Sequence, residues 1–106
     1  MQGVYLKFFV QENQKYHSLL VYEWLLREAK AMDIRGGSVF RAIAGYGRHG
    51  IMHEDHFIEL GGEMPLEVVF ALSDAEADAL LARVQDEGLA LFYVRMAATY
   101  GVVGKN

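Results

Sequence analysis

The chain has 106 residues, no cysteine and a formal net charge of −4 at neutral pH. This length favours one domain with a single core, and the lack of cysteine excludes disulfides, thiolate metal sites and cysteine nucleophiles. The negative charge argues against general nucleic-acid binding, and no apolar run approaches the roughly 20 residues that a membrane crossing requires. We therefore expect one cytoplasmic domain over residues 1–106, with no membrane insertion.

The first part of the chain predicts a strand, a helix and a second strand. Residues 4–10, VYLKFFV, are rich in the β-branched and aromatic residues that favour strands. From about Ser18 the apolar residues recur with helical spacing, and the sequence RGG at 35–37 is expected to end that helix. Residues 38–44, SVFRAIA, predict the second strand.

The remaining part predicts a strand, a helix and a last strand. Residues 66–72, LEVVFAL, follow the only proline and predict the third strand. Ser73 and Glu76 have the spacing of a capping box, which begins a helix, and Gly88 is expected to stop it. Residues 91–100, LFYVRMAATY, predict the fourth strand.

This βαββαβ order predicts an α+β, ferredoxin-like fold, a four-stranded antiparallel sheet with two helices on one face. The other face of such a sheet would show alternating polar residues if water covered it. Residues 68–72 and 92–94 are instead continuously apolar. Because large exposed apolar patches are rare on monomers, we expect self-association to cover this face.

The connection from Gly45 to Met64 is long for neighbouring strands, and long connections are usually functional or mobile. Its glycines could present backbone amides to an anion, and arginine is a permanently charged donor suited to phosphate or carboxylate. Two simpler explanations stay open, a flexible glycine turn and arginines paired with the acids between Glu54 and Glu67. The candidate anion site comprises Arg41, Gly45, Tyr46, Gly47, Arg48 and Gly50.

A metal site is the alternative for the same connection. His49, His53 and His56 have spacings of four and three, which would place them on one face of a helix. The surrounding glycines disfavour a helix there. Glu54 and Asp55 are adjacent and cannot pair as an acid and a base on a strand, and no serine has a nucleophile-elbow context. We therefore do not expect an enzyme.

The block SVFRAIAGYG at 38–47, followed by Gly50, His53 and Met64-Pro65, resembles the PII-like proteins of the nitrogen-regulatory PII superfamily. The resemblance implies a ferredoxin-like homotrimer with its sheets toward the threefold axis. It also implies that residues 47–64 form a T-loop that reaches a partner protein, a transporter or an enzyme. In such proteins small effectors, often adenine nucleotides, bind between subunits at the base of that loop, which points to Gly45, Gly47, Arg48 and Gly50.

The sequence departs from PII proteins proper at three places. Their Thr-Gly-x-x-Gly-Asp-Gly-Lys phosphate loop corresponds to QDEGLAL at 85–91, the lysine after the proline of the third strand is Leu66, and residues 99–106 contain no Arg-x-Arg-Thr-Gly tail. These departures argue against triphosphate binding in the PII manner and leave open a smaller or less charged ligand, or none. We expect a regulatory protein whose effector orders the 47–64 loop, with a metal-binding trimer or a ligand-free structural subunit as alternatives.

Overall fold

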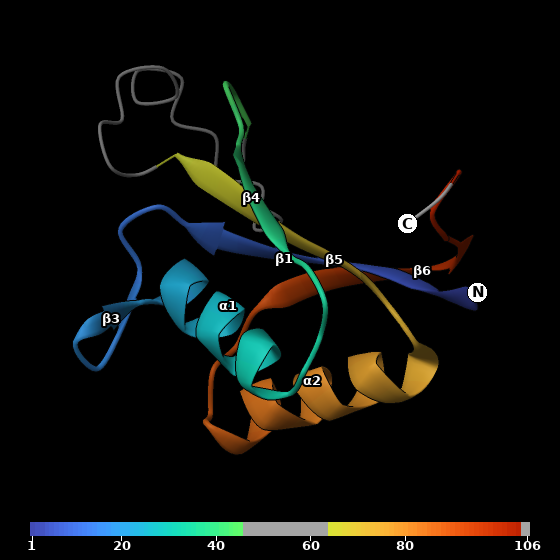
Figure 1. Ribbon diagram of the computed structural model, residues 1–106. Helices are drawn as coiled ribbons and strands as arrows, with labels where there is room; N and C mark the ends of the chain where they lie inside the picture. The colour runs from blue at the N-terminus through green and yellow to red at the C-terminus, as the bar shows by residue number, and fades with distance from the viewer. Residues whose placement is uncertain (46–63, 105–106) are drawn as a thin grey trace.

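The computed structural model describes residues 1–45 and 64–104 and places two helices on one face of a four-stranded sheet (Figure 1). All strand pairs are antiparallel, in the order β4-β5-β1-β6, which confirms the ferredoxin-like prediction. Among the described residues, no helix combines the length and apolar character needed to span a bilayer. The elements are β1 (Gln2–Gln11), β2 (Lys15–Tyr16), β3 (Leu19–Leu20), α1 (Val21–Ala31), β4 (Ser38–Arg41), β5 (Pro65–Leu72), α2 (Asp74–Asp86) and β6 (Phe92–Thr99).

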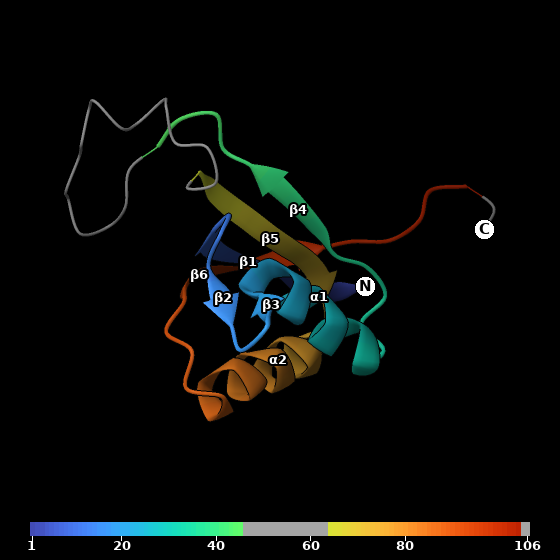
Figure 2. The same cartoon turned by 90° about the vertical axis from the view of Figure 1, so that its left-hand side faces the viewer.

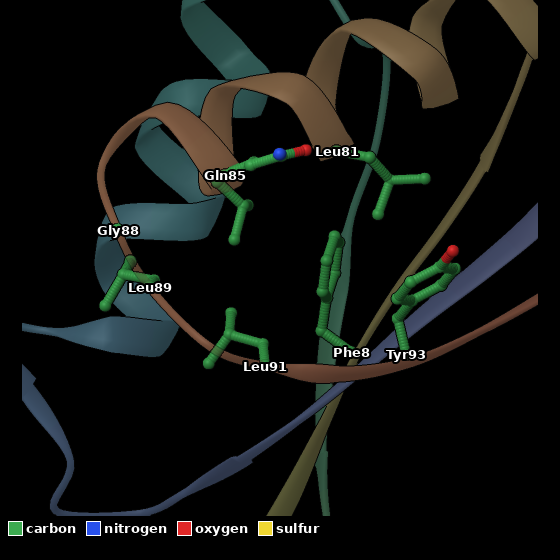
Figure 3. Close-up of a pocket in the computed structure, with 8 residues that line it drawn as sticks. Phe8, Leu81, Gln85, Gly88, Leu89, Leu91 and Tyr93 are labelled. Atoms are coloured by element: carbon green, nitrogen blue, oxygen red, sulfur yellow. The ribbon is translucent and has the colours of Figure 1, made fainter.

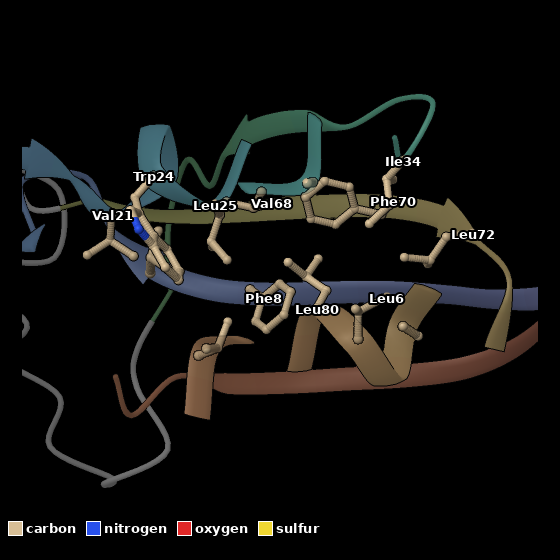
Figure 4. Close-up of a cluster of buried hydrophobic side chains, with 14 of the residues drawn as sticks. Leu6, Phe8, Val21, Trp24, Leu25, Ile34, Val68, Phe70, Leu72 and Leu80 are labelled. Atoms are coloured by element: carbon tan, nitrogen blue, oxygen red, sulfur yellow. The ribbon is translucent and has the colours of Figure 1, made fainter. Parts of the chain in front are cut away.

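The core lies between the sheet and the two helices (Figure 4). Because strand side chains alternate between faces, every second residue of β1 and β5 points toward the helices. Phe8 and Phe70 meet edge to face there, with ring centroids 6.4 Å apart. The central buried side chains are Leu6, Phe8, Val21, Leu25, Val68, Phe70, Leu72 and Leu80.

Helix α1 is shorter at both ends than the sequence suggests. It begins at Val21 and not near Ser18, because residues 15–20 form the β2–β3 hairpin, a small two-stranded sheet beside the helices (Figure 2). It ends at Ala31, well before the predicted glycine exit at 35–37. Two-residue strands are too short to leave a periodic pattern, so sequence reasoning assigned the hairpin to the start of the helix.

The exit of α1 uses an aspartate where a glycine is usual. Asp33 has a φ of 62°, and its N–H donates to the Lys30 carbonyl at 3.0 Å. The N–H of Ile34 donates to the Ala29 carbonyl at 3.0 Å, which completes a Schellman motif. Ile34 is buried, so its side chain anchors the chain after the turn.

Helix α2 has the two ends that its sequence predicts. The Ser73 hydroxyl accepts from the Glu76 N–H at 3.1 Å, and the Glu76 carboxylate accepts from the Ser73 N–H at 2.9 Å. Gly88 follows the helix with a φ of 75°. The capping box and the glycine stop are therefore both confirmed, because each depends only on local backbone geometry.

The face of the sheet away from the helices carries exposed apolar side chains in the described chain. The β1 register places Tyr5 opposite Met96 and Phe9 opposite Phe92 on this face. Met96 is 50% exposed and Phe40 of β4 is 56% exposed. Lys7 and Glu67 form an ion pair of 2.9 Å among them. We call this surface the open face; it comprises Tyr5, Lys7, Phe9, Phe40, Glu67, Val69, Phe92, Val94 and Met96.

Candidate functional site

The described residue with the strongest anion-binding chemistry in the predicted site is Arg41, the last residue of β4. Its partner across the ladder is Leu66, which faces the core, so Arg41 also points to the helix side of the sheet. Val10 of β1 is the other partner of Leu66. The Arg41 guanidinium donates to the carboxylate of Glu12, just beyond the end of β1. This ion pair therefore spans β5 at one end of the sheet.

Backbone hydrogen bonds attach the same place to both ends of the β4–β5 connection. The N–H of Glu12 donates to the Met64 carbonyl at 3.0 Å. The N–H of Ala42 donates to the Pro65 carbonyl at 2.9 Å. We call Glu12, Arg41, Ala42, Met64 and Pro65 the loop root, because the connection leaves and re-enters the sheet here.

The ion pair leaves part of the guanidinium accessible. The side chain of Arg41 is 61% exposed, whereas that of Glu12 is 23% exposed. The hydrogen bond to Glu12, and then the charge of that carboxylate, raise the pKa of Arg41. Arginine has five N–H donors in a planar fork, so Glu12 cannot satisfy all of them. An anion at the loop root could therefore reach Arg41 directly.

Gly45 is the other described residue of the predicted site. A Cβ added there would lie 3.7 Å from the Pro65 side chain, an ordinary contact, and its φ lies outside the left-handed region. The fold of this chain therefore does not require glycine at position 45. Any need for glycine would come from the close approach of something else, such as a ligand or a second subunit.

The other predicted ligands lie outside the described residues. They are Tyr46, Gly47, Arg48 and Gly50 of the anion site, and His49, His53 and His56 of the alternative metal site. Within residues 1–45 and 64–104, no group of three His, Asp or Glu side chains is arranged to hold a metal ion. Both hypotheses about the 46–63 segment stay predictions.

Sequence reasoning missed Glu12 as the partner of Arg41. The carboxylates that the sequence suggests as partners are those between Glu54 and Glu67. Glu67 instead pairs with Lys7 on the open face. The available signal was the strand order, because in a ferredoxin-like sheet the ends of the first and second strands both lie beside the start of the third.

Residues 85–91, which the sequence resemblance places at the PII phosphate loop, contain the end of α2. The N–H groups of Glu87, Gly88 and Leu89 donate to the carbonyls of Arg83, Gln85 and Val84, at 3.2, 3.0 and 3.3 Å. The last two bonds form a second Schellman motif. The Glu87 carboxylate accepts from Tyr16 and Arg83. These three amides are therefore occupied, and the nearest side chain is negative, so this segment does not offer an anion nest.

A cavity of about 360 Å³ lies between the end of α2 and the start of β6 (Figure 3). Its lining offers an anion little beyond the Gln85 amide and the Tyr93 hydroxyl. It is next to β6, whereas Arg41 is on β4 at the opposite edge of the sheet. Within one chain, the cavity and the loop root are therefore separate. The lining residues are Phe8, Leu81, Val84, Gln85, Gly88, Leu89, Leu91 and Tyr93.

Most of the chain matches a known protein family. The model of the DUF190 family, described as uncharacterized ACR, COG1993, matches residues 3–92. The chain belongs to the DUF190 family. A curated protein similar to this DUF190 chain is the UPF0166 protein of Aquifex aeolicus, 33% identical over 63 residues. That alignment covers 59% of this chain and 60% of the relative, less than two thirds of its length.

Solved structures similar to this DUF190 chain are PII-like proteins. One from Thermus thermophilus, described as PII-like and signalling, has a TM-score of 0.62 at 19% identity and covers 92% of this chain and 87% of that chain. CPII of Thiomonas intermedia K12, bound to ADP, AMP and acetate, has a TM-score of 0.63 at 14% identity, covering 95% and 90%. At these identities the likeness establishes the fold, which is that of PII-like proteins.

Proposed function

We propose that this DUF190 chain is a PII-like regulatory protein that binds a small anionic effector, an adenine nucleotide, at the loop root. The observation that carries this proposal is the exposed guanidinium of Arg41 where the β4–β5 connection joins the sheet. Guanidinium groups bind phosphate oxygens through charge-assisted hydrogen bonds. The structures of CPII with ADP and AMP give the same fold a precedent for this ligand class.

The effector site is completed by residues that sequence alone suggests. Gly45 lies beside Pro65, where an added Cβ would make only an ordinary contact. Tyr46, Gly47, Arg48 and Gly50 follow it directly in the chain. The amides of residues 87–89 are occupied in capping α2, so this segment offers no additional donors to a triphosphate.

We further propose that the protein is a homotrimer assembled through the open face. Tyr5, Phe9, Phe40 and Met96 would lie in the subunit contact, removed from water. The free energy gained would come from burial of apolar surface. We also propose that the effector clefts lie between subunits, at the end of the sheet that carries the loop root. Control of a partner protein through residues 47–64 completes the proposed role.

Calorimetric titration with ADP tests the effector proposal. Wild-type protein should bind ADP saturably, and ADP should raise the melting temperature by mass action. Arg48→Ala should weaken binding by about tenfold, the loss of one charge-assisted hydrogen bond, and leave the oligomer intact. If injecting ADP into the protein released no more heat than injecting ADP into buffer, the proposal would be contradicted. A thermal shift with Zn²⁺ or Ni²⁺ and none with ADP would favour the loop histidines instead.

A further inference from the structure

The ion pair at the loop root places a carboxylate where the proposed effector would bring its own negative charge. Glu12 accepts from the Nη2 group of Arg41, and the bond is the largest contribution to the raised pKa of that arginine. Without an effector, the acceptor for this Arg41 donor is therefore a side chain of the protein itself. A guanidinium cannot donate the same N–H fully to two acceptors, so a phosphate that uses this edge must displace Glu12.

The two partners differ in how firmly they are held. Glu12 is the less exposed side chain, and its own N–H is bonded to the Met64 carbonyl. Arg41 ends its strand and keeps most of its side chain in solvent. The arginine is therefore the partner that is free to reorient, while the carboxylate stays at the root. Breaking the pair costs little, because exposed ion pairs contribute modestly to stability.

We propose that Glu12 is an internal competitor for the effector, which occupies Arg41 in the empty protein and gives it up to the effector's phosphate. This inference rests on the proposed function, since it concerns the same site. Glu12 lowers the affinity of the protein for the effector, so that only a ligand with enough negative charge binds Arg41. Its release also frees a carboxylate whose backbone is joined to Met64, which links occupancy of the site to the β5 end of the connection.

The test compares ADP binding by four proteins in the same calorimetric titration: wild type, Glu12→Gln, Arg41→Ala and the double variant. Glu12→Gln should bind ADP about threefold to fivefold more tightly, the factor expected for release from an exposed ion pair. Arg41→Ala should bind more weakly. The double variant should bind like Arg41→Ala, because Glu12 has nothing to compete for once the arginine is gone.

Asp33→Asn is the matched control for the change of charge. It removes one carboxylate beyond the far end of α1 and keeps a residue that tolerates a positive φ. Its ADP affinity should equal that of wild type. Melting curves of every variant without ligand show that each is folded.

Each other outcome overturns a stated part of the proposal. Equal or weaker binding by Glu12→Gln, with ADP still bound by wild type, rejects the competitor and keeps the effector site. If Glu12→Gln increases ADP affinity by the same factor in the wild-type and Arg41→Ala backgrounds, Glu12 acts only by general charge repulsion. This outcome also rejects the competitor proposal. Failure of wild type and all variants to bind ADP rejects the effector and the competitor together.

Discussion

At the residue scale, the two helices end at residues of different type that adopt the same left-handed backbone conformation. Gly88 and Asp33 both end a helix in the left-handed region, with φ values of 75° and 62°. Glycine adopts this conformation without a steric penalty, whereas an aspartate has a Cβ that crowds the backbone. The aspartate also places a negative charge at the negative end of the α1 dipole. Position 33 is therefore a site of local strain that the fold retains.

Asp33→Gly should raise the free energy of unfolding by about 1 kcal/mol, because it removes the left-handed penalty. Gly88→Ala should lower it by about 1–2 kcal/mol for the converse reason. An added Cβ at Gly88 would meet no atom within 4 Å, so that loss measures backbone conformation alone. Urea unfolding of the purified variants measures both changes. Asp33→Asn separates the charge from the backbone; if it matches Asp33→Gly, the dipole explanation replaces the strain explanation.

At the element scale, one cluster of side chains connects the β2–β3 hairpin to both helices through packing and hydrogen bonds. Tyr16 of the hairpin packs edge-on against Trp24 of α1, with ring centroids 5.5 Å apart, and donates its hydroxyl hydrogen to Glu87. Arg83 of α2 donates to Glu87 and, at 2.8 Å, to Glu28 of α1. The guanidinium also lies 5.8 Å from the centre of the Trp24 ring. The cluster therefore holds the end of α2 against α1 and the hairpin.

Glu87 gives this cluster a pH dependence. Hydrogen bonds from Tyr16 and then from Arg83 lower the pKa of Glu87 below its ordinary range. A lowered folded-state pKa means that the ionised carboxylate stabilises the fold above the unfolded pKa of about 4.3, and that this stabilisation is lost as the pH falls through the lower folded value. Glu87→Gln should therefore lower the melting temperature at neutral pH, and the difference from wild type should shrink as the pH falls below about 4.3.

Melting curves of wild type and Glu87→Gln over this pH range measure the difference. Tyr16→Phe is the matched variant, because it removes the hydrogen bond with the larger effect on the pKa of Glu87 and leaves the contact with Arg83. It should reduce the pH dependence without abolishing it. A difference between wild type and Glu87→Gln that is constant from neutral to acid pH would show that Glu87 stabilises the cluster by packing and not by charge.

At the scale of the whole molecule, the open face is the feature that a single chain leaves unexplained. Its apolar side chains surround the Lys7–Glu67 ion pair, and the Lys7 ammonium lies 5.9 and 5.7 Å from the ring centres of Tyr5 and Phe9. Glu67 raises the pKa of Lys7 through their hydrogen bond, so the ammonium stays charged over the physiological range. Inside an assembly this pair would be desolvated, and the cost of desolvation would offset much of its Coulombic attraction.

Met96→Asp should break the proposed trimer. It places a carboxylate in the open face, where assembly would bury the charge without a partner, and such burial is strongly unfavourable. Sedimentation velocity should then show one species of one-third the wild-type mass. Ala79→Asp makes the same change of charge on the exposed side of α2 and should leave the assembly intact. Wild type that sediments as a monomer would reject assembly through this face.

The elements that could be predicted from the sequence are those whose signals are local. The apolar pattern of residues 4–10 and 66–72, the Ser73–Glu76 capping box and the Gly88 stop all depend on neighbouring residues, and the structure confirms each. The sequence also indicated the ferredoxin-like order and the apolar second face, because both follow from the succession of elements. The helix exit at Asp33 escaped prediction, since the usual signal for a left-handed helix end is glycine, and the glycines lie further on at 36 and 37.

The contacts between residues distant in sequence depend on how the elements pack in the folded chain. Arg41 finds Glu12 because β5 lies between β4 and β1 and brings their ends together. Glu28 and Glu87 share Arg83, and Tyr16 donates to Glu87, because the hairpin and both helices pack on one face of the sheet. Side-chain pairs across a sheet or between layers depend on strand order and packing. Periodicity along the chain reports which face a residue occupies, and it carries no information on which residue lies across from it.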